Sequence, residues 1–308
     1  MESHLFRVNK FVISGFALGI SVIVLAALNS KVAGDPFEPK LEVSQEALDL
    51  TVDLGEPRPT LLYLPQEYDG SSKVPLLINL HGYSGNGSSQ SAYTRLQEVA
   101  FNNGIAYVAP DGLADNLGNN YWNATTACCD FNKSKVDDVE YIDSLIKRAQ
   151  ESAKIDSKRI YLFGHSNGHF MAYAYLCNGK RNVAAVAGLA GAMEPDLSKC
   201  KAKQSNILHI HGLLDQTILY EGGSLFGNPY SSVASTIDQW SAINGCANET
   251  KTESDQLTSI PGPDSEVSSF DCTKGSLELW SMPQGVHTPS LDLGFAQRVL
   301  DWLLSKSL

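Results

Sequence analysis

The chain has 308 residues, of which 43% are apolar and 19% are charged. These values are ordinary for a globular protein and exclude a disordered or collagen-like chain. The 34 acidic and 23 basic residues give a formal net charge of −11 at pH 7. A nucleic-acid partner is not expected, because binding to a phosphate backbone needs a basic surface.

The first 34 residues have the pattern of a secretory signal. Arg7 and Lys10 precede an uncharged apolar run, Phe11–Leu28, and the pattern predicts cleavage after Gly34. The alternative is an uncleaved membrane anchor, because the apolar run just reaches the length that spans a bilayer. With cleavage, residues 35–308 remain and no stable membrane partner is expected. Export would place all six cysteines in an oxidising compartment, where disulfides are the default.

Short strand-like segments alternate with helical patterns along the rest of the chain. Several of these segments are apolar throughout, which is typical of parallel strands covered on both faces. The alternation predicts an α/β fold, with a mostly parallel central sheet and helices on both faces. The predicted strands are Thr60–Leu64, Pro75–Leu80, Ile105–Ala109, Arg159–Phe163, Val183–Leu189, Asn206–Ile210 and Ser276–Trp280. The predicted helices lie in Val136–Ala153, Gly168–Leu176, Ser232–Ile243 and Leu291–Leu304.

The stretch Ala247–Asp271 is rich in Ser, Thr, Asp and Pro. We interpret it as a surface excursion without regular structure. A strand and a helix are predicted after it, so it is not a linker between domains. Residues 35–308 are therefore predicted to form one domain.

A serine follows one of the predicted strands in a glycine-rich turn. Arg159–Phe163 leads into Gly164-His165-Ser166-Asn167-Gly168, and a helical pattern begins there. A G-x-S-x-G turn between a strand and a helix holds its serine in a strained backbone at the edge of the sheet. A β-carbon at either glycine would collide with the neighbouring strand or helix. We predict that Ser166 is a nucleophile.

The base and the acid that would accompany Ser166 follow from chain order. After such a serine the acid comes next and the histidine last. Only His287, of the seven histidines, lies in a loop between the last predicted strand and the last helix. Asp215 follows the strand Asn206–Ile210 and sits three residues after Gly212. We therefore predict Ser166, Asp215 and His287 as a catalytic triad.

A second glycine turn follows the early strand Pro75–Leu80, beginning with His81-Gly82-Tyr83. In G-x-S-x-G hydrolases the second oxyanion donor comes from such a turn. We predict that the backbone amides of Tyr83 and Asn167 form the oxyanion hole, and that the Tyr83 ring lines the acyl pocket. Trp122 lies in a loop where it would either contact substrate or anchor the loop by packing.

Several motifs together resemble the secreted esterase family that includes poly(3-hydroxybutyrate) depolymerases and feruloyl esterases (carbohydrate-esterase family one). They extend from about Leu50 to Leu304. The motifs are Leu80-His81-Gly82, Pro110-Asp111-Gly112, Trp122-Asn123-Ala124 with Cys128-Cys129, Val136-Asp137-Asp138-Val139, Gly164-His165-Ser166-Asn167-Gly168, His211-Gly212 with Asp215, Tyr220-Glu221-Gly222-Gly223, and Trp240 with Asn244-Gly245-Cys246.

The resemblance implies an α/β-hydrolase fold and the same roles for Ser166, Asp215 and His287. The chain departs from the family after His287. The family often has an aromatic residue two positions after this histidine, and this chain has Pro289 there. That difference affects the pocket wall and not the base. The segment between Leu189 and Asn206 is too short for a large lid.

The resemblance also suggests a disulfide between Cys246 and Cys272. The other four cysteines, Cys128, Cys129, Cys177 and Cys200, allow three pairings. We favour a bond from Cys128 or Cys129 to Cys177, since a bond between adjacent cysteines is strained.

These features predict a secreted serine carboxylesterase that needs no cofactor or metal. Its ester substrate, which can be a polymer, would be feruloylated or acetylated polysaccharide, or a hydroxyalkanoate polyester. Two alternatives stay open. One is a serine peptidase of the same fold, and the other is a non-catalytic polymer-binding protein on an esterase scaffold.

Overall fold

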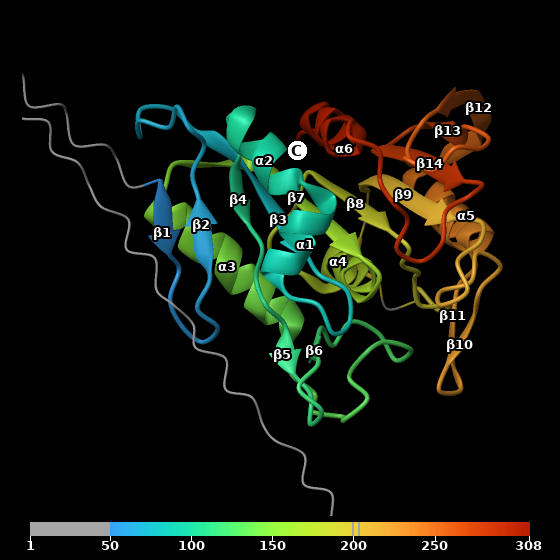
Figure 1. The fold of residues 1–308 in the computed structure, drawn as a ribbon, viewed down its shortest axis with the longest axis horizontal. Helices are drawn as coiled ribbons and strands as arrows, with labels where there is room; N and C mark the ends of the chain where they lie inside the picture. The colour runs from blue at the N-terminus through green and yellow to red at the C-terminus, as the bar shows by residue number, and fades with distance from the viewer. Residues whose placement is uncertain (1–49, 199, 203) are drawn as a thin grey trace, which may run out of the picture. The chain divides into compact units, whose positions relative to one another are not determined.

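The computed structural model describes residues 50–308, except residues 199 and 203. The predicted signal, residues 1–34, lies outside the described residues. Within the described part, ten strands form one sheet in the order β1-β2-β4-β3-β7-β8-β9-β14-β13-β12 (Figure 1). The strands of this sheet are β1 (Thr51–Asp53), β2 (Leu61–Tyr63), β3 (Val74–Leu80), β4 (Ala106–Val108), β7 (Ile155–His165), β8 (Ala185–Leu189), β9 (Asn206–Gly212), β12 (Cys246–Asp255), β13 (Ser265–Cys272) and β14 (Ser276–Met282).

The six central strands, from β4 to β14 in that order, run parallel, and antiparallel pairs extend the sheet at both edges. Four of these strands, β3, β4, β8 and β9, are buried almost throughout, as their largely apolar sequences predict. The predicted α/β-hydrolase fold, with a mostly parallel sheet at its centre, is confirmed.

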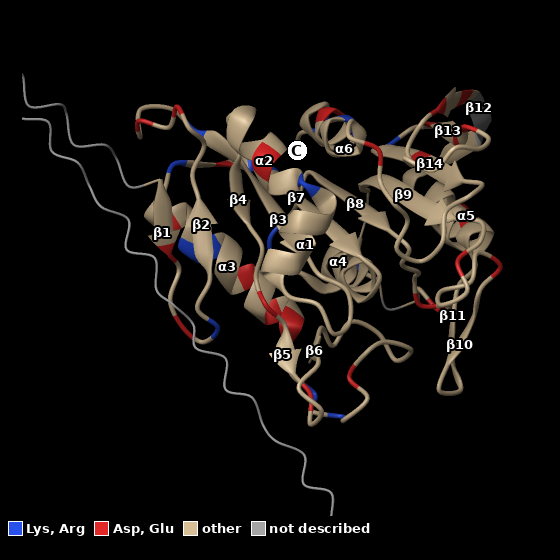
Figure 2. Cartoon of the chain, in the orientation of Figure 1, with Lys and Arg blue, Asp and Glu red and all other residues tan. Residues whose placement is uncertain are grey.

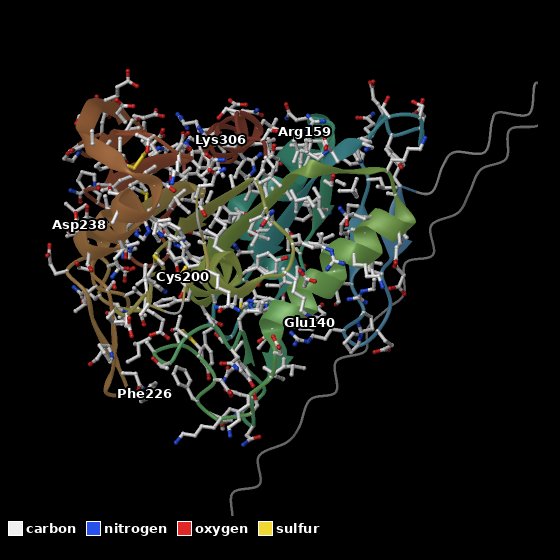
Figure 3. All side chains as sticks on the ribbon, turned by 180° about the vertical axis from the view of Figure 1, so that it is seen from behind. Glu140, Arg159, Cys200, Phe226, Asp238 and Lys306 are labelled. Atoms are coloured by element: carbon white, nitrogen blue, oxygen red, sulfur yellow. A yellow bond between two sulfur atoms is a disulfide. The ribbon has the colours of Figure 1, made fainter. Side chains whose placement is uncertain are left out.

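Helices cover both faces of the sheet. On one face the core contains side chains from α3, α4 and α5, and on the other it contains side chains from α2 and α6. Figure 1 shows α1 and α2 in front of the sheet, and Figure 3 shows α3, which carries Glu140, from behind. The helices are α1 (Gly87–Thr94), α2 (Leu96–Asn102), α3 (Asp138–Ser152), α4 (Asn167–Asn178), α5 (Val233–Asn244) and α6 (Phe295–Leu304).

Two short hairpins lie outside the main sheet. They are formed by β5 (Leu113–Ala114) with β6 (Asn120–Tyr121), and by β10 (Gly223–Leu225) with β11 (Asn228–Tyr230). Both hairpins belong to loops that follow the carboxyl ends of central strands, which is the edge where Ser166 stands.

The sequence analysis interprets the polar stretch after α5 as lacking regular structure, and this interpretation is wrong. Its residues form β12 and β13, an antiparallel pair that extends the main sheet beyond β14. β12 is the edge strand, and β13 lies between β12 and β14 with most of its side chains partly or fully exposed, so polar residues are tolerated in both.

The connection between β8 and β9 has no helix among its described residues, and the absence of a large lid stays a prediction. Figure 2 shows lysine and arginine residues as short separate segments over the described elements, not gathered on one of them. No helix of the described residues has both the length and the apolar character needed to cross a membrane.

Candidate active site

Ser166 occupies the turn between β7 and α4. Its backbone has φ +53° and ψ −121°, a conformation that residues with a β-carbon rarely adopt. The flanking glycines permit this turn. A β-carbon on Gly164 would lie 2.2 Å from the carbonyl oxygen of Gly168, and one on Gly168 would lie 2.1 Å from that of Leu80. The strand–turn–helix context of Ser166 is therefore the one the sequence predicts.

Three loops bring Ser166, His287 and Asp215 into one hydrogen-bonded chain. The Ser166 hydroxyl lies 2.9 Å from Nε2 of His287, and Nδ1 of His287 lies 2.8 Å from Oδ2 of Asp215. Asp215 accepts a hydrogen bond from the Nδ1–H group of His287, which leaves Nε2 as the acceptor for the serine hydroxyl. The three residues are 49 to 121 positions apart in the chain, and they follow β7, β9 and β14.

The Asp215 carboxylate is buried and fixed from several directions. Its Oδ1 accepts hydrogen bonds from the amides of Thr217 (2.8 Å) and Ile218 (2.9 Å). Burial acts to raise the pKa of Asp215, but hydrogen bonds from His211 and His287 outweigh it and hold that pKa well below 3.8. Asp215 is therefore a permanent anion that can orient His287 and stabilise its protonated form.

The Gly82–Tyr83 peptide lies against the serine. A β-carbon on Gly82 would be 3.3 Å from Cβ of Ser166. The Gly82 carbonyl accepts from the Gly85 amide (3.0 Å) and from Nδ1 of His81 (2.7 Å). Because the amide of a trans peptide points opposite to its carbonyl, these bonds fix the direction of the Tyr83 N–H.

The buried His81 ring is held in one tautomer. Its Nε2 accepts from the Gly112 amide at 2.9 Å, so its proton is on Nδ1, where it reaches Gly82. Burial lowers the pKa of His81 below 6.5, which keeps the ring neutral and able to accept. Asn167, the other predicted donor residue, is the first residue of α4, so its amide has no partner one turn earlier in that helix.

A cavity of about 320 Å³ opens beside Ser166. Its lining includes Tyr83, whose hydroxyl donates to Asp115 (2.5 Å). The Tyr83 ring meets Phe131 edge-on at 5.5 Å, and Phe131 meets Phe226, at the tip of the β10–β11 hairpin, at 4.7 Å. A row of aromatic rings thus leads from the cavity to the exposed Phe226.

Trp122 does not reach this cavity. Its side chain is completely buried, and its Nε1 donates to the His81 carbonyl at 3.0 Å. The Asn167 side chain binds both backbone groups of Trp122, accepting from its amide (2.7 Å) and donating to its carbonyl (2.9 Å). Of the two predicted roles, Trp122 therefore has that of a packed anchor, which ties its loop to the serine turn.

The structure contains the predicted Cys246–Cys272 disulfide, but the prediction for Cys177 is wrong. Cys177 bonds to Cys200, and Cys128 bonds to Cys129. Cys128 and Cys129 pack with Phe170 near the start of α4, whereas Cys177 lies seven residues later, about 10 Å along the helix. Asn167, and not a disulfide, joins the Trp122 loop to the serine turn.

His165 contributes to the site, although chain order excludes it as the base. Its Nε2 donates to the backbone carbonyl of His287 at 2.9 Å. Burial lowers the pKa of His165 to about 4, so the ring stays neutral beside His287. Its position directly before Ser166 is the sequence signal that could have identified it.

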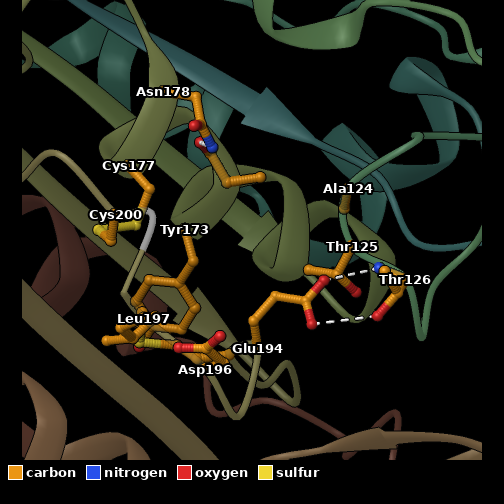
Figure 4. A pocket seen from close by; sticks show the side chains of 12 residues that line it. Ala124, Thr125, Thr126, Tyr173, Cys177, Asn178, Glu194, Asp196, Leu197 and Cys200 are labelled. Carbon is orange, nitrogen blue, oxygen red and sulfur yellow. Dashed lines mark hydrogen bonds between the residues drawn. A yellow bond between two sulfur atoms is a disulfide. The ribbon is translucent and has the colours of Figure 1, made fainter.

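Figure 4 shows a second cavity, of about 400 Å³, beside α4. Glu194 accepts two hydrogen bonds from Thr126 there, and the Cys177–Cys200 disulfide forms part of the wall. None of the three residues of the hydrogen-bonded chain lines this cavity, so it is not where Ser166 would act. Among the described residues, no group of three or more His, Cys, Asp or Glu side chains is arranged to hold a metal ion.

Comparisons with known proteins agree with this geometry. Residues 68–254 match the phospholipase/carboxylesterase family model. Feruloyl esterase B of Piromyces equi is 28% identical over 231 residues, which cover 72% of this chain and 40% of that protein. A probable feruloyl esterase C of Aspergillus niger is 28% identical over 170 residues, 53% of this chain and 56% of that protein.

The chain thus spans about half the length of these curated relatives, or less. A solved acetyl xylan esterase from Aspergillus awamori has the same fold, with a TM-score of 0.60 and 15% identity over 82% of this chain and 97% of that one. The esterase resemblance that the motifs predict is confirmed, and the chain belongs to the phospholipase/carboxylesterase family.

Proposed function

We propose that this protein is a serine carboxylesterase and that Ser166, His287 and Asp215 are its catalytic triad. One observation carries the proposal: the unbroken hydrogen-bonded chain from the Ser166 hydroxyl through His287 to the buried Asp215 carboxylate. It stands beside a cavity and beside a peptide whose amide direction is fixed.

The mechanism follows from these contacts. Nε2 of His287 takes the Ser166 proton as Oγ attacks the ester carbonyl. The amides of Tyr83 and Asn167 receive the oxyanion, each contributing about 2.7–4 kcal/mol to lowering the barrier. His287 then gives the proton to the leaving alkoxide, and water attacks the acyl-enzyme by the same relay. Asp215 stays charged throughout and stabilises the imidazolium.

The proposed substrates are feruloyl or acetyl esters of polysaccharide. Relatives named feruloyl esterase and a structural neighbour named acetyl xylan esterase support this class. The aromatic row from Tyr83 to Phe226 suits a planar acyl group or a sugar ring face. A hydroxyalkanoate polyester, the other substrate that the sequence analysis predicts, belongs in the same test.

The test is a panel of ethyl ferulate, acetylated xylan, hydroxybutyrate oligomers and short p-nitrophenyl esters, with a peptide anilide as the competing substrate. We expect hydrolysis of the esters and not of the anilide, and labelling of the wild type by a fluorophosphonate probe but not of Ser166→Ala. Hydrolysis of the anilide at a higher kcat/KM than every ester would identify a peptidase. A wild type that neither labels nor hydrolyses any substrate would identify a binding protein.

We further propose that the protein is exported, with residues 1–34 as its signal and 35–308 as its catalytic domain. The three disulfides support this, because they persist in oxidising compartments. Protein recovered from the medium of expressing cells should begin at Asp35. Retention of the whole chain in the membrane fraction would indicate an anchor instead.

A further inference from the structure

A string of three buried polar side chains ends at Asp215. The Tyr173 hydroxyl, on α4, lies 2.8 Å from Nδ1 of His209, and Nε2 of His209 lies 3.3 Å from Nδ1 of His211. Nε2 of His211 lies 2.8 Å from the Ile218 carbonyl oxygen and 3.5 Å from Oδ2 of Asp215. The three side chains are at most 2% exposed.

With one proton on each imidazole ring, a single arrangement of hydrogen bonds satisfies this string. The Ile218 carbonyl can only accept, so the proton of His211 is on Nε2 and its Nδ1 is an acceptor. His209 must then donate from Nε2, which leaves its Nδ1 to accept from the Tyr173 hydroxyl. Burial lowers the pKa of His209 well below 6.5 and raises that of Tyr173 well above 10, so both are neutral.

The inner end of the string holds Asp215 through Ile218. The Ile218 amide donates to Oδ1 of Asp215 at 2.9 Å, while the Ile218 carbonyl accepts from His211. His211 therefore fixes the residue that fixes the carboxylate, and its N–H also faces Oδ2, the oxygen bound to His287.

His169 covers the string from α4. Its ring centroid is 4.4 Å from that of Tyr173 and 5.0 Å from that of His209. The ring is completely buried, and neither of its nitrogens has a hydrogen-bond partner within the described part of the chain. Burial lowers the pKa of His169 well below 6.5, so a neutral ring covers the string.

We propose that Tyr173, His209 and His211 are positioning residues, which lock the Asp215 carboxylate in the orientation that His287 requires. This inference rests on the proposed function, since it assigns the residues to that triad. Without the Tyr173 hydroxyl, His209 is free to take its other tautomer. The lone pairs of His209 Nε2 and His211 Nδ1 then face each other, and the restraint on His211 and Ile218 weakens.

The chain offers a matched pair of variants for the test. Tyr173 and Tyr175 are both buried on α4, but the Tyr175 hydroxyl donates to Asp143 (3.0 Å) and has no part in the string. We expect Tyr173→Phe to lower kcat about fivefold, the equivalent of one lost hydrogen bond, with KM unchanged. Tyr175→Phe should leave both constants unchanged. Equal effects of the two substitutions on kcat would overturn the proposal.

Nuclear magnetic resonance gives a readout that does not depend on activity. Long-range ¹H–¹⁵N spectra should show His209 and His211 each with a ring proton on Nε2 and none on Nδ1. Tyr173→Phe should mix the His209 tautomers and shift the His287 Nδ1 proton resonance, whereas Tyr175→Phe should not. A proton on Nδ1 of His211, or an unshifted His287 resonance in Tyr173→Phe, would overturn the string. Failure of the wild type to label with fluorophosphonate would overturn the esterase proposal alone.

Discussion

Ser166 has a positive φ in a turn so tight that a β-carbon on Gly164 or Gly168 would collide with neighbouring backbone. The strained turn raises the hydroxyl toward His287, whose ring is held by Asp215 on the other side. Each of Ser166, His287 and Asp215 therefore depends on the other two, and their contributions to catalysis should not be additive.

We predict that Ser166→Ala, His287→Ala and Asp215→Asn each lower kcat by several orders of magnitude, and that double variants are scarcely worse than single ones. The exposed Ser224, on β10, provides the control, since Ser224→Ala should keep full activity. Steady-state kinetics with a short p-nitrophenyl ester measures the effect. Near-normal turnover of His287→Ala would mean that another base serves Ser166.

The glycines around Ser166 give a second prediction at this scale. A β-carbon on Gly168 would lie 2.1 Å from the Leu80 carbonyl oxygen, and backbone cannot move aside cheaply. Gly168→Ala should lower the free energy of unfolding by about 1–3 kcal/mol, as overpacking does. The control is Gly294→Ala, where φ is −85° and the close neighbours are mostly the end of a flexible arginine side chain. Urea unfolding of the two variants makes the comparison, and equal stability would contradict the expected clash.

At the scale of elements, the sequence predicts the central strands well, and it places Ser166, Asp215 and His287 in loops that follow such strands, as the structure does. Most of these strands contain apolar runs, and in G-x-S-x-G hydrolases the serine, acid and histidine follow the strands in a fixed order. The strands β12 and β13, at one end of the sheet, could not be recognised, because their sequences contain no apolar run. Helix α1 was missed because its inward side chains include Gln90 and Thr94, which bind Asn79, a pairing that periodicity does not detect.

The supporting contacts of the site could be predicted least. The bonds from Asn167 to Trp122 and from His81 to Gly112 join segments 45 and 31 residues apart, and no spacing rule announces them. One signal was available. His209 and His211 alternate on a strand that is otherwise apolar, which places two polar rings on one buried face.

The edge hairpin carries the Cys246–Cys272 disulfide, in which the two cysteines are 26 residues apart. On the chain-entropy estimate, closing such a loop stabilises the fold by about 3.5 kcal/mol. We expect the double variant Cys246→Ser/Cys272→Ser to lose stability of this order in urea unfolding while kcat changes little, because β12 and β13 lie away from Ser166 in the sheet order. A loss of kcat without a loss of stability would reverse this assignment.

The connection between β8 and β9 leads to a prediction about access. Cys200 in this connection is bonded to Cys177 on α4, which restrains it, and its described residues include no helix. We therefore expect no interfacial activation. The rate with a p-nitrophenyl ester should rise smoothly through the solubility limit of the substrate. A sudden increase when substrate aggregates form would reveal a moving cover over Ser166.

At the scale of the whole molecule, the fold buries several neutral histidines. Burial lowers the pKa of four of them below 6.5. The four are His81, His165, His169 and His209. In the unfolded chain they take up protons near pH 6.5, whereas in the folded protein they resist protonation. Each therefore contributes stability that is present above about pH 6.5 and is lost as the pH falls below it.

The free energy of unfolding should consequently fall between pH 7.5 and pH 5. The unfolded state binds more protons than the folded state in this range, so stability rises with pH, by at most about 1.4 kcal/mol per pH unit for each of the four rings. Asp215 does not interfere, because its lowered pKa keeps it charged in the fold and its contribution to stability is lost only below about pH 4.

Urea unfolding at several pH values measures the slope of stability against pH. His169→Phe is the matched variant, since neither nitrogen of His169 has a partner to lose among the described residues, and its slope should be smaller by one proton. An unchanged slope in this variant, or greater stability of the wild type at pH 5 than at pH 7.5, would show that these rings are protonated inside the fold.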